Sequence, residues 1–163
     1  MPLVRMGLRP NLVRYQMANQ GVTPRSLFTH AVAFSSAAEA VHAAKIPDPL
    51  PKFFLWGRAT ELVLKSFLLA EGQSVAKLKS KEFGHDLNAL LRDAEARGIP
   101  KLIGLNSTYC TIVRILNLDY LSKRFEYRET GATYQLPDIT LTRQLVNRLL
   151  KGVDFHLKNH YGI

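Results

Sequence analysis

The stretch KFFLWGRATELVLKSFLLAEG, residues 52–72, decides the fold. Its apolar residues cover most of a helix's circumference, which is typical of a helix buried at the centre of a bundle. Arg58, Glu61 and Lys65 are its main polar exceptions, and their spacing of three and four places them on one stripe. Gly72 is a natural C-terminal cap. The stretch therefore predicts a central helix that carries one polar stripe.

Working outward, apolar periodicity and breaks at Gly and Pro predict four more helices, near residues 23–45, 86–98, 106–120 and 138–153. Residues 124–137 show no helical period, so we expect an extended, strand-like excursion across the surface. We expect Gly152 to weaken or bend the last helix and the tail to Ile163 to fray. The predicted fold class is all-α, an up-and-down bundle of four to five helices.

The chain has 163 residues, which suits a single helical domain over residues 23–163. Residues 1–22 carry Arg5, Arg9 and Arg14 and no acid, and we predict a flexible basic arm; a targeting peptide or a wrongly chosen start codon would look similar. Cys110 is the one cysteine, so no internal disulfide can form. No apolar run approaches the roughly 20 residues of a membrane span. We expect a soluble, cytoplasmic protein without a cofactor.

The formal net charge is +9, with 22 basic against 13 acidic residues, which favours contact with polyanions without proving it. Arg124 and Arg128 are interleaved with Phe125, Tyr127 and Tyr134, a combination that can hold phosphates and stack bases. The equally open alternative is that the aromatic side chains anchor an irregular segment while the charges face water.

Three histidine patterns could carry chemistry. His85 and Asp86 could form a catalytic pair, although Asp86 as a helix N-cap is the simpler interpretation. Arg25 and His30 are spaced as in some helical ribonucleases, where histidine acts as a base on a ribose hydroxyl; chance explains this match as well. Two further histidines, His156 and His160, have metal-ligand spacing but no cysteine or HExxH companion, so we expect no metal site.

Three stretches together resemble the HEPN family of nucleotide-binding helical domains: residues 58–72, the Gly84-His85-Asp86-Leu87 signature, and residues 120–128 with the final helix. The resemblance implies a four- or five-helix bundle, often a homodimer, with a ligand groove formed by the second helix and the connector before the last helix. Several family members are metal-independent ribonucleases of toxin or defence systems. Their Arg…His motif is missing here, because no histidine follows the arginines of residues 124–148 by four to six positions.

The first hypothesis is therefore a HEPN-like module that binds RNA or a nucleotide without catalysis, beside an antitoxin or nucleotidyltransferase partner. The second is a metal-independent ribonuclease that uses His85 or His30 as its base. The third is a structural or partner-binding dimeric bundle. The predicted ligand-binding residues are Arg58, Glu61, Lys65, His85, Asp86, Arg124 and Arg128, and the weak catalytic candidates are His85, His30 and Arg25.

Overall fold

The computed structural model describes residues 4–9, 12–16 and 21–163. Strands β1 (Val4–Arg9) and β2 (Leu12–Gln16) pair antiparallel, with Val4 opposite Gln16. This hairpin falls in the segment for which the sequence predicts a flexible arm; residues 1–3, 10–11 and 17–20 of that arm lie outside the described residues. The local signal for it is the alternation of apolar and other residues through β1, a period of two.

All regular structure in residues 21–163 is helical, which confirms the all-α fold class. The two short helices are α3 (Val75–Lys79) and α5 (Ile99–Ile103). The five longer ones are α1 (Pro24–Ala43), α2 (Leu50–Ala70), α4 (Leu87–Ala96), α6 (Ser107–Leu121) and α7 (Ile139–Tyr161). No helix of this described part is both long and apolar enough to cross a bilayer.

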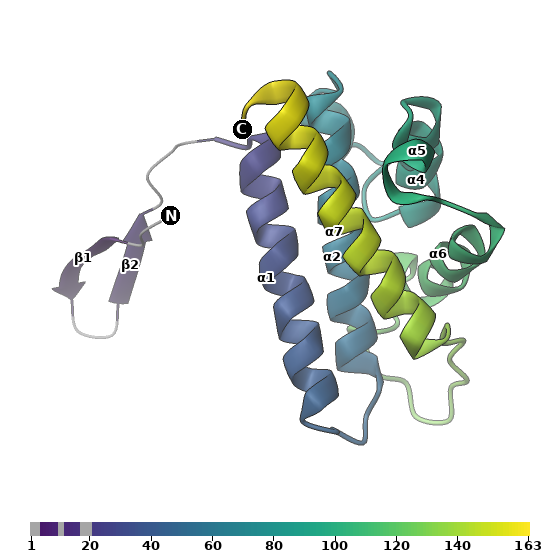
Figure 1. Cartoon of the computed structure of the whole chain (residues 1–163). Helices are drawn as coiled ribbons and strands as arrows, with labels where there is room; N and C mark the ends of the chain where they lie inside the picture. Colours follow the sequence, from purple (N-terminus) through teal and green to yellow (C-terminus); the bar gives the residue numbers. More distant parts are fainter. Residues whose placement is uncertain (1–3, 10–11, 17–20) are drawn as a thin grey trace.

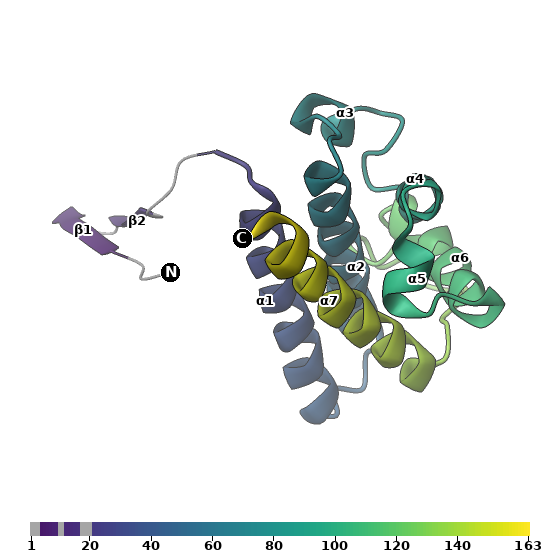
Figure 2. The ribbon, with the colours of Figure 1, turned by 45° about the horizontal axis from the view of Figure 1, so that its top comes forward.

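Helix α2 is the centre of the bundle, as its sequence predicts. Helices α1, α2 and α7 run side by side, and α4, α5 and α6 lie together next to them (Figures 1 and 2). Helix α2 packs against α1, α3, α4, α6 and α7. Its largest fully buried side chains are Phe53, Trp56 and Phe67. A polar residue on α2 must therefore find its partners inside the protein.

Side-chain caps explain where the helices begin. The hydroxyl of Thr23 accepts a hydrogen bond from Ser26 N at the start of α1. Asp86, Asn106 and Asp138 cap α4, α6 and α7 in the same manner. Each cap satisfies a backbone N–H that has no partner within its own helix. Asp86, the capping residue of α4, fixes the turn that holds His85.

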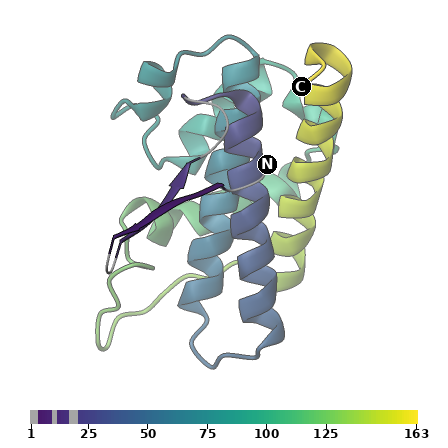
Figure 3. The same ribbon diagram turned by 90° about the vertical axis from the view of Figure 1, so that its left-hand side faces the viewer.

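The segment between α6 and α7 contains no helix, which confirms that part of the prediction, but it consists of turns and irregular backbone without a strand, so its strand-like character is wrong. Buried Asp119 holds it in place by accepting hydrogen bonds from Arg124 Nη1 at 2.5 Å and from Gln135 N at 2.9 Å. Figure 3 shows this connector next to the turn between α1 and α2. The hydrogen bonds to the Asp119 carboxylate hold the segment in place without the backbone hydrogen bonds that a β-strand would form with a neighbouring strand.

The end of α7 also differs from the prediction of a frayed tail. The helix continues through Gly152 to Tyr161, because Glu71 accepts hydrogen bonds from the Tyr161 hydroxyl at 2.7 Å and pairs with His156 at 2.6 Å. Gly152 provides space for a close approach: a Cβ there would lie 2.7 Å from Ile103 Cγ2. The glycine lets α5 pack directly on α7.

Candidate functional site

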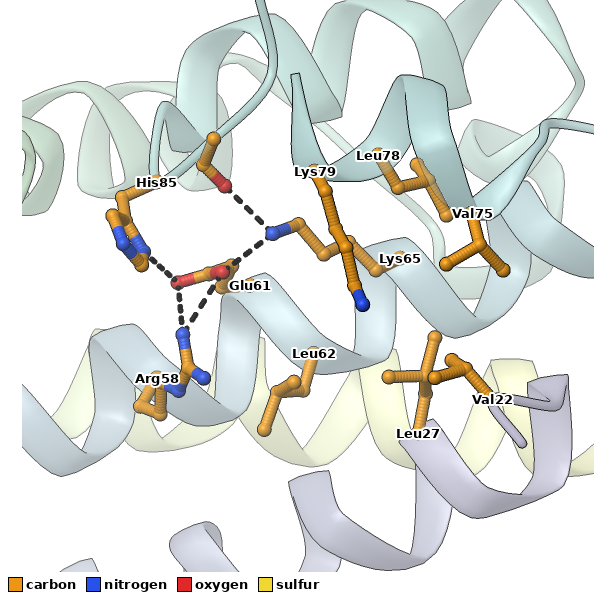
Figure 4. A pocket seen from close by; sticks show the side chains of 11 residues that line it. Val22, Leu27, Arg58, Glu61, Leu62, Lys65, Val75, Leu78, Lys79 and His85 are labelled. Atoms are coloured by element: carbon orange, nitrogen blue, oxygen red, sulfur yellow. Dashed lines mark hydrogen bonds and ion pairs between the residues drawn. The ribbon is translucent and has the colours of Figure 1, made fainter. Parts of the chain in front are cut away.

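Glu61 is the most unusual side chain of α2, a carboxylate that is only 1% exposed. Lys65 Nζ donates to its Oε1 at 2.7 Å, and Arg58 Nη1 lies 3.0 Å from each oxygen. On Oε2, the Tyr120 hydroxyl donates at 2.5 Å and His85 Nδ1 lies at 3.0 Å. Arg58, Lys65 and His85 converge on Glu61 in Figure 4. Both oxygens are therefore fully occupied by donors of the same chain.

Two glycines bring the partners within reach of Glu61. Gly84 lies in the turn before α4 with a φ of +39°, and its carbonyl accepts a second hydrogen bond from Lys65 Nζ at 2.7 Å. Gly57 lies one turn before Glu61, where a Cβ would be 2.5 Å from Tyr120 Cδ2. Without that Cβ, the tyrosine ring packs flat against α2 and its hydroxyl reaches the carboxylate.

The network keeps Glu61 ionised. Burial alone would raise the pKa of this carboxyl, but the charge of Lys65 and the hydrogen bonds from His85, Lys65 and Tyr120 outweigh it and lower the pKa. Burial and the adjacent carboxylate raise the pKa of Tyr120, so its hydroxyl stays a neutral donor. For Arg58, the attraction of Glu61 overcomes the effect of burial and raises the pKa, so the guanidinium stays charged.

A pocket of about 290 Å³ opens beside this network, between α1, α2, α3 and the turn before α4. Its polar lining comprises Arg58, Glu61, Lys65, Lys79, Gly84 and His85. Its apolar lining comprises Val22, Leu27, Leu62, Val75 and Leu78. The exposed Lys79 from α3 extends across the pocket in Figure 4 and forms no ion pair within residues 21–163. Two cationic side chains, Arg58 and Lys65, thus bind the carboxylate, and a third, Lys79, lines the same pocket next to an aliphatic wall.

Four of the predicted ligand-binding residues, Arg58, Glu61, Lys65 and His85, come together in this pocket. Asp86, the fifth, does not line it. Its carboxylate accepts hydrogen bonds from Asn88 N at 3.0 Å and Ala89 N at 3.1 Å as the cap of α4. Asn117 Nδ2 on α6 donates to the same Oδ1 at 3.0 Å. These hydrogen bonds give Asp86 a structural role as the cap of α4.

The connector arginines lie elsewhere and are paired. Arg124 Nη1 donates to Asp119, and its guanidinium lies 4.8 Å from the centre of the Tyr134 ring. Arg128 Nη1 donates to Asp48 in the turn between α1 and α2 at 2.8 Å, beside a separate hollow of about 270 Å³. Neither arginine lines the pocket next to Glu61.

The pair of weak catalytic candidates on α1 is also outside the pocket. Arg25 binds Asp154 of α7 at 2.7 Å and the carbonyl of Ile163. His30 is exposed, with its ring 4.9 Å from that of Phe34. His85 is therefore the one histidine of the described residues that lines this pocket.

Comparison of this chain with family models, curated proteins and solved structures gives no match. The HEPN resemblance stays a prediction, and the function has to be argued from the geometry of the site.

Sequence reasoning missed two members of the site. Nothing local in the sequence shows that the hydroxyl of Tyr120, on α6, reaches α2 from 59 positions away. A glycine at position 57 of an otherwise bulky helix was the available signal that a large side chain packs there. Lys79 gives no comparable signal, because α3 is too short to show a helical period.

Proposed function

We propose that this pocket binds a phosphate-bearing ligand, a nucleotide or a short segment of RNA, and that it does so without catalysing a reaction. The observation that carries the proposal is that three cationic side chains, Arg58, Lys65 and Lys79, line one pocket that holds a single carboxylate and has an aliphatic wall. Cations hold phosphate oxygens, and the apolar wall suits a base or sugar face.

Free hydrogen-bond donors of the Arg58 guanidinium favour an anionic ligand. Arg58 uses Nη1 for Glu61, whereas its Nε and Nη2 have no hydrogen-bond partner within residues 21–163. Its side chain is 29% exposed, so a ligand can reach these donors. Lys79 adds a second accessible cation, and a planar guanidinium together with a point charge is a common phosphate-binding combination.

The size of the pocket favours a mononucleotide unit. Small-molecule pockets measure roughly 300–1,000 Å³, and this one, at about 290 Å³, lies at the lower end. One nucleotide, alone or splayed out from single-stranded RNA, is the largest ligand of this class that suits such a volume. The chain's net charge of +9 agrees with a polyanionic ligand. The homodimer, the antitoxin or nucleotidyltransferase partner and the cytoplasmic location remain predictions.

Binding can be tested by isothermal titration with adenosine 5′-monophosphate and with a single-stranded RNA oligomer. Lys79→Ala and Arg58→Ala should each weaken binding by about ten- to a hundred-fold, the effect of losing one charged hydrogen bond. Lys151→Ala is the matched control, because Lys151 is exposed on α7, away from the pocket lining. Affinity should fall between about 50 and 200 mM salt. Equal effects of Lys79→Ala and Lys151→Ala would contradict the proposal.

The same RNA, incubated with EDTA, tests the ribonuclease alternative. Cleavage that disappears in His85→Ala would overturn the non-catalytic part of the proposal and leave the pocket as an active site. No cleavage is the expected result.

One observation favours a purely structural role as the second candidate. Every donor to Glu61 belongs to the same chain, and Lys65 is only 12% exposed, so the network also works as an internal brace between α2, α6 and the turn before α4. In that case the wild-type protein would bind neither the nucleotide nor the RNA, and Lys79→Ala would have no effect.

A further inference from the structure

The contact between Glu61 and His85 determines which nitrogen of the histidine carries the proton. The carboxylate is ionised, and an ionised carboxylate can only accept hydrogen bonds. Since His85 Nδ1 lies 3.0 Å from Glu61 Oε2, Nδ1 must be the donor. In neutral His85, Nε2 then has a lone pair and acts as an acceptor.

The position of His85 presents that acceptor to the pocket. The side chain is 45% exposed and lines the pocket, and Nε2 has no hydrogen-bond partner within residues 21–163. The ring of Tyr120 stands nearly perpendicular to the imidazole, at 83° and 6.3 Å between centres. This contact and the bond to Glu61 fix the orientation of the imidazole.

No other side chain of the described polar lining offers a free acceptor. Arg58, Lys65 and Lys79 are donors only. The oxygens of Glu61 are taken by Arg58, Lys65, His85 and Tyr120, and the Gly84 carbonyl accepts from Lys65. A hydroxyl on a bound ligand would therefore find its side-chain acceptor at His85 Nε2.

We propose that His85 Nε2 accepts a hydrogen bond from the ribose 2′-hydroxyl of the ligand, so that the pocket selects ribonucleotides over 2′-deoxyribonucleotides. This inference rests on the proposed function, because it needs a nucleotide in the pocket. The 2′-hydroxyl is the group by which proteins distinguish RNA from DNA. His85 acts here as a specificity-determining residue.

The first test needs no ligand. Long-range ¹H–¹⁵N correlation spectra of the free protein at about pH 8, where histidine side chains are ordinarily neutral, report the tautomer of each imidazole. His85→Gln identifies the signals of His85 by their disappearance. The expected pattern is a protonated Nδ1 and an unprotonated Nε2. A protonated Nε2 would overturn the inference and leave phosphate binding by Arg58 and Lys79 unaffected.

The second test compares adenosine 5′-monophosphate with its 2′-deoxy form by isothermal titration at the same pH. Loss of one hydrogen bond should weaken binding of the deoxy form about three- to ten-fold. His85→Phe should abolish this preference, so that both nucleotides bind with about the same affinity, whereas His85→Gln, whose amide oxygen can still accept, should retain part of it. A purely structural role of His85 would change both affinities equally.

The two possible failures are distinguishable. If both nucleotides bind wild-type protein equally, the selectivity by His85 is wrong and the proposed function stands. If neither nucleotide binds, the proposed function fails and the inference fails with it. Unfolding temperatures of the His85 variants are measured alongside, so that a folding defect is recognised.

Discussion

Replacing Glu61 with glutamine tests the central claim that one buried carboxylate holds this site together. Glutamine keeps the shape of the side chain but removes the charge and substitutes an NH₂ group for one acceptor oxygen. That NH₂ would face groups that are themselves donors, from Lys65, Arg58, His85 and Tyr120. At least one of these donors must lose its partner.

The burial of the partners sets the size of the effect. Breaking a buried ion pair by removing one partner costs about 3–5 kcal/mol. Lys65, at 12% exposed, cannot regain water without moving, whereas Arg58 at 29% and His85 at 45% can partly do so. We therefore expect Glu61→Gln to lower the free energy of unfolding by about 3 kcal/mol, the lower end of that range. For a domain of this length, each kcal/mol shifts Tm by about 2–4 °C, so Tm should fall by about 6–12 °C.

Thermal unfolding followed by circular dichroism measures this loss, and its pH dependence checks the cause. The folded protein holds the pKa of Glu61 below its ordinary value of 4.5, so the carboxylate contributes fully above that pH and its contribution is lost as pH falls through the folded pKa. The difference between wild type and Glu61→Gln should therefore narrow in acid. Glu126→Gln, at an exposed glutamate, should change stability by less than about 0.5 kcal/mol. A loss at neutral pH no larger than that of the control would refute the reasoning.

Three further substitutions test the packing and capping of the helices. Gly57→Ala places a Cβ 2.5 Å from the buried Tyr120 ring, so urea unfolding should show a loss of about 1–3 kcal/mol; an unchanged midpoint would mean that the ring is not against α2. Gly152→Ala places a Cβ 2.7 Å from Ile103 and should lower the free energy of unfolding by a similar amount. A urea unfolding curve that coincides with that of the wild type would contradict this prediction. Asp86→Ala removes the cap of α4 and should lower stability by about 1–2 kcal/mol, and hydrogen exchange should show faster opening at the start of α4 and nowhere else.

The starts of the long helices were predictable because each depends on local chemistry. A capping residue followed by an apolar period identifies α1, α4, α6 and α7 without knowledge of the rest of the chain. Helices α3 and α5 were not predicted, because five residues make less than two helical turns and cannot show a helical period of apolar residues. The proline at position 100 signals a break in the sequence, yet it occupies the first turn of α5, where its missing N–H costs nothing.

The strand-like character of the connector and the fraying at the end of α7 were predicted incorrectly because distant partners fix both segments. Asp119 is on α6, and its hydrogen bonds to the connector exist only after α6 has packed. Glu71 at the end of α2 binds Tyr161 from 90 positions away. Distant partners also pair with Arg124 and Arg128, at Asp119 and Asp48, and the binding of a ligand by these two arginines stays a prediction. Sequence spacing shows which residues share a helix face and not which element will cover it.

Glu61 connects the stability of this fold with its proposed ligand. Arg58, Lys65 and Lys79 would repel one another in a partly buried pocket, and a single carboxylate can offset only part of that repulsion. Lys65 is committed to the fold by its bonds to Glu61 and to the Gly84 carbonyl, whereas Lys79 makes no ion pair within residues 21–163. The two lysines should therefore separate the two roles: Lys65→Met should lower Tm, and Lys79→Ala should lower ligand affinity with Tm unchanged. If Lys79→Ala lowered Tm as much as Lys65→Met, the positive charge of the pocket would belong to the fold alone, and the argument for a phosphate ligand would lose its basis.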